Sequence, residues 1–168
     1  MILETERLVL HELTDQDAPF ILELLMSRGF RENIGDRGVR DLDGARDYID
    51  RARAGYAANG FGLWRIEVKA TGETAGISGL VKRDGLEHPD VGYALLEPFW
   101  GRGYATEAAG ASLAYGRDVL GLTTIVAITT PTNTDSIAVL RKIGLRDAGA
   151  IRLPDHAEDS AYFTTDQV

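Results

Sequence analysis

Cysteine is absent from this 168-residue chain. Its absence excludes disulfide bonds, thiolate zinc sites and a cysteine acyl-enzyme intermediate. The only histidines, His11, His88 and His156, are scattered without metal-ligand spacing, so we expect no metal centre. The chain also lacks the Gly-Lys-Ser/Thr triplet of a P-loop and the Gly-x-Ser-x-Gly elbow of an α/β-hydrolase, which argues against both classes.

Long apolar runs and an excess of basic residues are missing as well. No stretch approaches the length of a membrane span, and the acidic N-terminus lacks the basic head and apolar core of a signal peptide. A net charge of −8 argues against nucleic-acid binding and against an anionic membrane surface. The acidity is compatible with a cationic acceptor such as an amine, although it also simply keeps a protein in solution. We therefore expect a cytoplasmic protein with no nucleic-acid or membrane partner.

The remaining composition suits one domain over residues 1–168. Hydrophobic residues make up 44% of the chain, enough for a core, and no proline- or serine-rich linker divides it. Periodicity and turn residues predict the following elements: strands at 5–13, 62–69, 74–82, 91–96 and 123–129, and helices at 14–27, 43–58, 103–118 and after Asn133. We expect Gly29 to end the first helix and residues 31–41 to form a mobile loop.

The most informative segment is FWGRGYATEA, residues 99–108, which places a glycine-rich turn between a strand and a helix. The first turn of a helix leaves backbone N–H groups unpaired and carries partial positive charge, so a phosphate can bind there without a lysine. Gly101 and Gly103 keep side chains away from that phosphate, and Arg102 adds a charge. A dinucleotide fingerprint would need a third glycine where Thr106 stands, which argues against it.

Together with Asn133-Thr134-Asp135-Ser136 and the residues at 139–145, this segment resembles the GNAT acetyltransferase superfamily, and within it the RimJ/RimL-like branch of ribosomal-protein N-terminal acetyltransferases. The similarity starts at residues 4–10 and is strongest over 90–145. It implies an α/β GNAT fold: a mixed, mostly antiparallel sheet, a central parallel strand pair splayed into a cofactor cleft, and helices on both faces. Trp100 replaces the usual leading Gln/Arg of the family's glycine signature.

The resemblance also implies an activity. An N-acetyltransferase of this kind moves an acetyl group from acetyl-coenzyme A to a primary amine, of a protein N-terminus or a small molecule, by direct attack in a ternary complex without a metal. The alternative is a catalytically weak or inactive sensor that holds acyl-coenzyme A. We expect a monomer or homodimer, with an acceptor groove built from residues 28–42 and 153–165.

In the family, amides of the glycine turn grip the pyrophosphate, and the edge of the strand at 91–96 pairs with the pantetheine arm. Asn133 would bind that arm and cap its own helix. The expected cofactor-binding residues are Leu95, Leu96, Gly101, Arg102, Gly103, Tyr104, Ala105, Thr106 and Asn133.

The expected catalytic residues are Asp90 and Ser136. Asp90 matches the position of a catalytic glutamate in several family members, but its shorter side chain requires a bridging water, and a solvent-exposed carboxylate at a strand end is the plain alternative. His88 is a reserve candidate for the base. Ser136 can meet the thiolate leaving group or bond its own backbone, and Leu140 stands where many members place an acidic tyrosine. Glu107 is expected to support the helix N-terminus.

Overall fold

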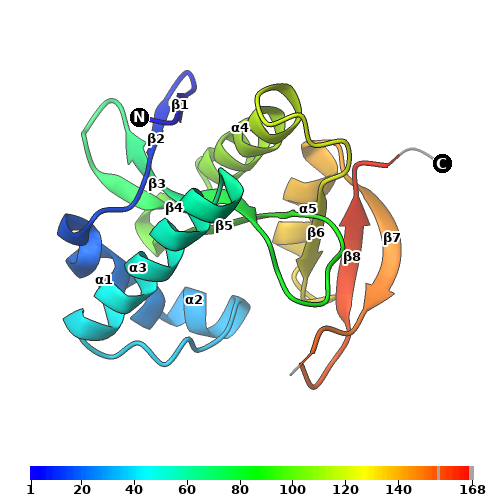
Figure 1. The fold of residues 1–168 in the computed structure, drawn as a ribbon, viewed down its shortest axis with the longest axis horizontal. Coiled ribbons are helices and arrows are strands. Elements are labelled where there is room, and N and C mark those ends of the chain that lie inside the picture. Colours follow the sequence, from blue (N-terminus) through cyan, green and yellow to red (C-terminus); the bar gives the residue numbers. More distant parts are fainter. Residues whose placement is uncertain (155, 167–168) are drawn as a thin grey trace.

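The fold is built on a mixed sheet, seen in a computed structural model that describes residues 1–154 and 156–166 (Figure 1). The sheet has eight strands in this part of the chain, in the order β1-β2-β3-β4-β5-β6-β8-β7. The strands are β1 (Leu3–Glu4), β2 (Leu8–His11), β3 (Leu63–Val68), β4 (Thr74–Val81), β5 (Asp90–Leu95), β6 (Val126–Thr129), β7 (Arg146–Ile151) and β8 (Ser160–Thr164). The α-helices are α1 (Ala18–Met26), α2 (Arg28–Asn33), α3 (Leu42–Asn59), α4 (Tyr104–Asp118) and α5 (Thr134–Lys142).

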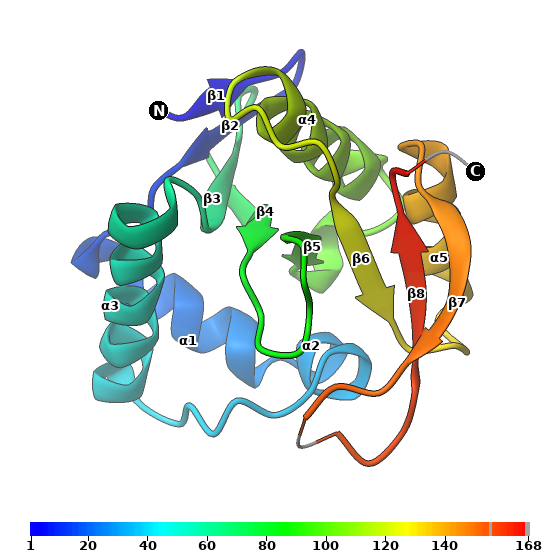
Figure 2. The same ribbon diagram turned by 45° about the vertical axis from the view of Figure 1, so that its right-hand side comes forward.

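Strands β1 to β5 form an antiparallel meander, and β5 and β6 are the parallel pair. Their register contains the single pair Asp90↔Val126, at the first residue of each strand. Beyond that pair the two strands separate, so that β6, β8 and β7 form a distinct group beside the meander (Figure 2). The expected splayed GNAT sheet is therefore confirmed.

Helices cover both faces of the sheet (Figure 1). Helices α1 and α3 pack against each other, whereas α4 packs on β4 and β5 and also contacts α5. The largest fully buried side chain, Trp64 of β3, meets Tyr115 of α4 edge to face, with ring centroids 5.4 Å apart. Burial of this apolar interior is the main source of stability for such a sandwich of layers.

Most of the predicted elements are present with bounds shifted by a few residues. The expected helix at 43–58 is α3, which ends at Gly60 in a left-handed conformation (φ 79°), and the helix at 103–118 is α4. The predicted strands at 5–13 and 123–129 are shorter, because only Leu8–His11 and Val126–Thr129 pair within the sheet.

The prediction that Gly29 ends the first helix was wrong. The break lies at Ser27, whose extended backbone ends α1 and whose hydroxyl caps α2 by accepting from the Phe30 amide. Gly29 lies inside α2, where the Trp100 ring packs on it: a Cβ atom would stand 2.4 Å from Trp100 Cζ2. The glycine is therefore explained by a close approach rather than by a helix end, and residues 31–33 belong to α2 rather than to a loop.

Candidate active site

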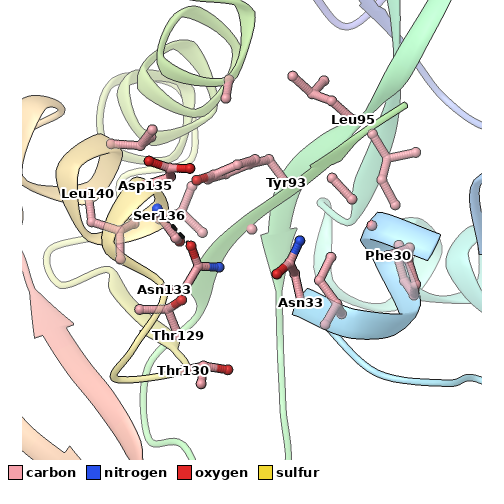
Figure 3. A pocket seen from close by; sticks show the side chains of 18 of the residues that line it. Phe30, Asn33, Tyr93, Leu95, Thr129, Thr130, Asn133, Asp135, Ser136 and Leu140 are labelled. Atoms are coloured by element: carbon pink, nitrogen blue, oxygen red, sulfur yellow. Dashed lines mark hydrogen bonds between the residues drawn. The ribbon is translucent and has the colours of Figure 1, made fainter. Parts of the chain in front are cut away.

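A cavity of about 630 Å³ opens where β5 and β6 separate (Figure 3). Its walls come from α2, β5, the turn before α4, the end of β6 and the first turns of α5. The volume lies within the roughly 300–1,000 Å³ range of small-molecule sites. The splayed strands thus leave a cavity of ligand size in the middle of the sheet.

One end of the cavity is closed by the turn that precedes α4. Gly101 (φ 72°) and Gly103 (φ 81°) both have left-handed backbone conformations, and Gly103 is the N-cap of α4. Within residues 1–154 and 156–166, none of the amides at positions 101–106 has a hydrogen-bond acceptor. Six N–H donors next to the positive end of a helix dipole are thus available to an anion.

The same turn is braced from the N-terminal strand. Glu107 accepts hydrogen bonds from the Thr5 hydroxyl, the Arg7 amide (3.0 Å) and Arg7 Nε (2.8 Å), while Arg7 Nη1 donates to the Arg102 carbonyl at 2.8 Å. The Arg7 guanidinium also lies 4.6 Å from the centre of the Tyr104 ring. Partial burial disfavours the charged carboxylate, but the hydrogen bonds from Thr5 and Arg7 outweigh it and hold the pKa of Glu107 below its usual value. Glu107 therefore supports the helix N-terminus, through a partner about a hundred residues away in the sequence.

The cavity side of β5 presents Leu95 and Tyr93 rather than Leu96. The Leu96 amide donates to Ala75 and its carbonyl accepts from Phe99, and Leu96 does not line the cavity. Backbone groups of neighbouring residues in a strand point to opposite sides, so those of Leu95 and Tyr93 face the open side. The Leu95 carbonyl accepts from the Trp100 indole at 2.9 Å, which fixes Trp100 at the rim. Arg102 also stays outside the cavity wall, with its guanidinium 5.8 Å from the Phe99 ring centre.

Helix α5 lines the opposite side. The Asn133 side-chain oxygen caps the helix by accepting from the Ser136 amide at 3.1 Å, which leaves its NH₂ group directed into the cavity (Figure 3). The capping role expected from the sequence is thus confirmed, and the NH₂ end of the amide has no hydrogen-bond partner in the described residues. Leu140 lies deeper in the same wall and supplies no acidic proton.

Tyr93 is a polar group that the sequence analysis missed. Its ring extends from β5 across the cleft towards Ser136 and Asp135 of α5 (Figure 3). Burial raises the pKa of the Tyr93 phenol, and the nearby Ser136 side chain opposes part of the rise. The signal that could have found it is its position: in the run Asp90–Leu95, Tyr93 is the one residue with a hydroxyl, and strand alternation places its backbone beside that of Leu95.

Asp90 lies at the far end of the cavity from the glycine turn and is only 2% exposed. Burial raises the pKa of its carboxyl group, and the Arg83 guanidinium opposes the rise. Arg83 Nε donates to both carboxylate oxygens, at 3.2 and 3.0 Å. The plain alternative of a solvent-exposed strand-end carboxylate is therefore wrong. His88, the reserve candidate, does not line the cavity.

Both segments expected to form an acceptor groove contribute to the cavity. Asn33, Ile34 and Arg37 come from the first segment, and His156 and Ser160 come from the second. Asp155, also in that second segment, lies outside the described residues. In the described ranges no group of three or more His, Asp or Glu side chains is placed to hold a metal ion, and no helix there is long and apolar enough to cross a membrane.

Residues 7–146 match the family model described as an acetyltransferase (GNAT) domain, so the chain belongs to the GNAT acetyltransferase family. It is 29% identical over 166 residues to an uncharacterized N-acetyltransferase of Bacillus subtilis, YoaA, covering 97% of this chain and 93% of the relative.

Solved structures agree with this assignment. An acetyltransferase from Agrobacterium tumefaciens superposes with a TM-score of 0.83 at 30% identity, covering 98% of this chain and 94% of that one. The ribosomal L7/L12 α-N-protein acetyltransferase RimL, in complex with coenzyme A, gives a TM-score of 0.82 at 17% identity, covering 98% and 99%. At that identity the second comparison concerns the fold, which RimL and this chain share.

Proposed function

We propose that this protein binds acetyl-coenzyme A in the cavity between β5 and β6 and transfers its acetyl group to a primary amine. The observation that carries the proposal is the set of unpaired amides at positions 101–106, which opens on that cavity. Its donors match the diphosphate of coenzyme A without the help of a lysine. RimL, with the same fold, holds coenzyme A in its crystal structure.

The other cofactor contacts follow from the two walls. The N–H and carbonyl of Tyr93 and the N–H of Leu95 present an open strand edge, and an extended amide-containing arm can pair with such an edge as an added strand does. The NH₂ group of Asn133 faces this edge from α5 (Figure 3). The residues proposed to bind the pantetheine arm are therefore Tyr93, Leu95 and Asn133. In this proposal Tyr93 takes the place that the sequence analysis gave to Leu96.

A thioester is an activated acyl donor, so a neutral amine can attack it directly. An α-amine has a pKa of about 8 and a lysine amine of about 10.4, so a proton must leave the amine before or during attack. Asp90, through a water, is the proposed acceptor of that proton, because its raised pKa makes it a better base than an ordinary aspartate. The new C–N bond replaces the C–S bond, and the amine proton leaves to Asp90.

The departing thiolate needs a proton. Ser136 is the proposed donor, and Tyr93, whose ring extends towards Ser136 (Figure 3), is proposed to return a proton to the serine oxygen. In this proposal Ser136, on the same helix as Leu140, and Tyr93, from β5 across the cleft, together replace a tyrosine at position 140. Asp90 and Ser136 thus keep the roles that the sequence indicated, with Tyr93 added as a positioning residue behind Ser136.

A sensor that holds acyl-coenzyme A without turnover is the second candidate. It is favoured by the engagement of both Asp90 oxygens with Arg83 and by the apolar Leu140 in the cavity wall. Mixing the protein with acetyl-coenzyme A and a panel of primary amines, and measuring free thiol, separates the two. Amine-dependent thiol release supports the enzyme, whereas tight binding without release supports the sensor.

A further inference from the structure

The end of the cavity beyond the thioester is the place where an acceptor must lie, and its residues indicate the kind of acceptor. This inference rests on the proposed function. The glycine turn and Asp90 are at opposite ends of β5, which has six residues. At about 3.3 Å per residue the strand separates them by roughly 17 Å. The acceptor therefore enters at the Asp90 end, between α2, α3 and the segment that follows β4.

Two guanidinium groups line this end. Arg83 is held in place by its Nε, which binds both oxygens of Asp90, while its terminal Nη1 and Nη2 make no hydrogen bond with any residue of the described ranges. Its side chain is 30% exposed, so these donors are accessible. Arg37 also lines the cavity and has no ion pair or hydrogen bond among residues 1–154 and 156–166. The cavity therefore presents guanidinium donors without acceptors.

Tyr48 of α3 lines the same cavity, within electrostatic range of both arginines. Burial raises the pKa of its phenol, and the positive charges of Arg37, Arg83 and Arg51 oppose the rise. The Tyr48 hydroxyl has no hydrogen-bond partner in the described part of the chain, although the residue contributes to the cavity wall. A neutral O–H donor beside two guanidinium groups is a typical environment for an oxyanion.

The formal charges identify which oxyanion fits. Arg37 and Arg83 contribute two positive charges and Asp90 one negative charge, which leaves one net positive charge at this end. The other acidic side chain in the described part of the wall is Asp135 of α5, which lies beside the Tyr93 ring (Figure 3). A carboxylate balances a single charge, whereas a phosphate group carries about −1.5 to −2 at neutral pH.

We propose that the acceptor is a small primary amine that carries a carboxylate, which Arg37, the terminal nitrogens of Arg83 and the Tyr48 hydroxyl bind while the amine faces Asp90. Phe30, Ile34 and Leu63 supply an apolar wall for the rest of the molecule. Asp90 then has a second role, because it anchors Arg83. The net positive charge at this end of the cavity disfavours a purely cationic acceptor, although the net negative charge of the whole chain favours one. Local charge decides what a cavity binds.

Binding of acetylated products tests this without depending on turnover or on the titration of an amine. The probes are N-acetyl-leucine and N-acetylglycine, each compared with its own amide, added to protein saturated with coenzyme A and measured by calorimetry. Loss of a charge-assisted contact costs about 10- to 100-fold in affinity. We expect at least one acid to bind 10-fold or more tightly than its amide, and Arg37→Gln or Tyr48→Phe to reduce that preference severalfold.

Arg40→Gln is the matched control, because Arg40 is in the same segment but pairs with Asp36 and does not line the cavity. It is expected to keep the preference. Amides that bind as well as the acids, absence of binding by both acids, or a preference that survives Arg37→Gln would overturn the inference. Coenzyme A binding is measured first, so that failure of this inference can be told from failure of the proposed function. Absence of coenzyme A binding contradicts the cofactor site. Coenzyme A binding together with faster acetylation of 3-methylbutylamine than of leucine contradicts the carboxylate site alone.

Discussion

Replacement of Gly103 by alanine tests the role of the amides before α4 most directly. Gly103 has a φ of 81°, and an added Cβ atom would lie 3.2 Å from Arg7 Nη2, a group at the end of a flexible side chain. The steric conflict is therefore small, and the main cost is about 1–2 kcal/mol for a non-glycine residue in the left-handed region. We expect the turn to relieve part of that strain by rotating residue 103 towards ordinary φ values, which would reorient the amides that follow it. Each lost hydrogen bond to a charged phosphate is worth about 1.5–3 kcal/mol, or roughly 10- to 150-fold in Kd.

Gly121→Ala supplies the matched comparison. Gly121 follows the other end of α4 with a φ of 70°, and a Cβ atom there would contact nothing within 4 Å. Both variants are expected to lose about 1–2 kcal/mol of unfolding free energy in a denaturant titration, but only Gly103→Ala is expected to weaken coenzyme A binding by 10-fold or more in calorimetry. Equal affinity of the two variants for coenzyme A would refute the assignment of residues 101–106 to the phosphates.

Three further predictions concern single side chains. Glu107 has a pKa below its usual 4.5, so its ionised form stabilises the fold above that pH and the stabilisation is lost as the pH falls through the lowered value. Glu107→Gln should lower the midpoint of thermal unfolding at pH 7, and the difference from wild type should disappear in acid. A difference that does not depend on pH would contradict the stabilising role of the Glu107 contacts with Thr5 and Arg7. Tyr93→Phe should lower kcat about 10-fold with little change in the KM for acetyl-coenzyme A. It should have almost no further effect in a Ser136→Ala background, since the two residues are proposed to act together. Additive effects of the two substitutions on kcat would show that Tyr93 and Ser136 act independently. Asp90 has a raised pKa, so kcat should rise with pH around a midpoint above the ordinary value of 3.8. Asp90→Asn should abolish this rise of kcat with pH. An unchanged pH profile of kcat in Asp90→Asn would exclude Asp90 as the base.

Local sequence signals predicted most of the elements, because glycine, proline and hydrophobic periodicity act over a few residues. The turn with Gly101 and Gly103, the cap at Asn133 and the C-terminal Gly60 of α3 all follow from backbone preferences of that kind. The break at Ser27 did not follow, since serine is a common residue within and before helices and its capping bond decides between the two.

Groups that act across the cavity were beyond local reasoning. The contact of Trp100 with Gly29 and the position of Tyr93 beside Ser136 both depend on how distant elements pack. Arg83 and Asp90 lie seven residues apart and come together because the register Val81↔Asp90 places the two strand ends side by side. Sequence periodicity specifies which face of an element is buried, but it does not specify which polar partner stands opposite.

The contacts of Glu107 with Thr5 and Arg7 couple the N-terminal segment to the proposed ligand affinity of the turn before α4. Thr5 and Arg7 hold the first turn of α4 from the segment between β1 and β2, so fraying of that segment releases the carboxylate and the Arg102 carbonyl together. Thermodynamic reciprocity then requires that a ligand seated on the amides slows hydrogen exchange of the first ten residues, and that an extension which pulls this strand away weakens the ligand by the same factor. An amino-terminal tag that displaces Thr5 and Arg7 is therefore expected to weaken binding at the proposed phosphate site, although the tag lies outside the cavity.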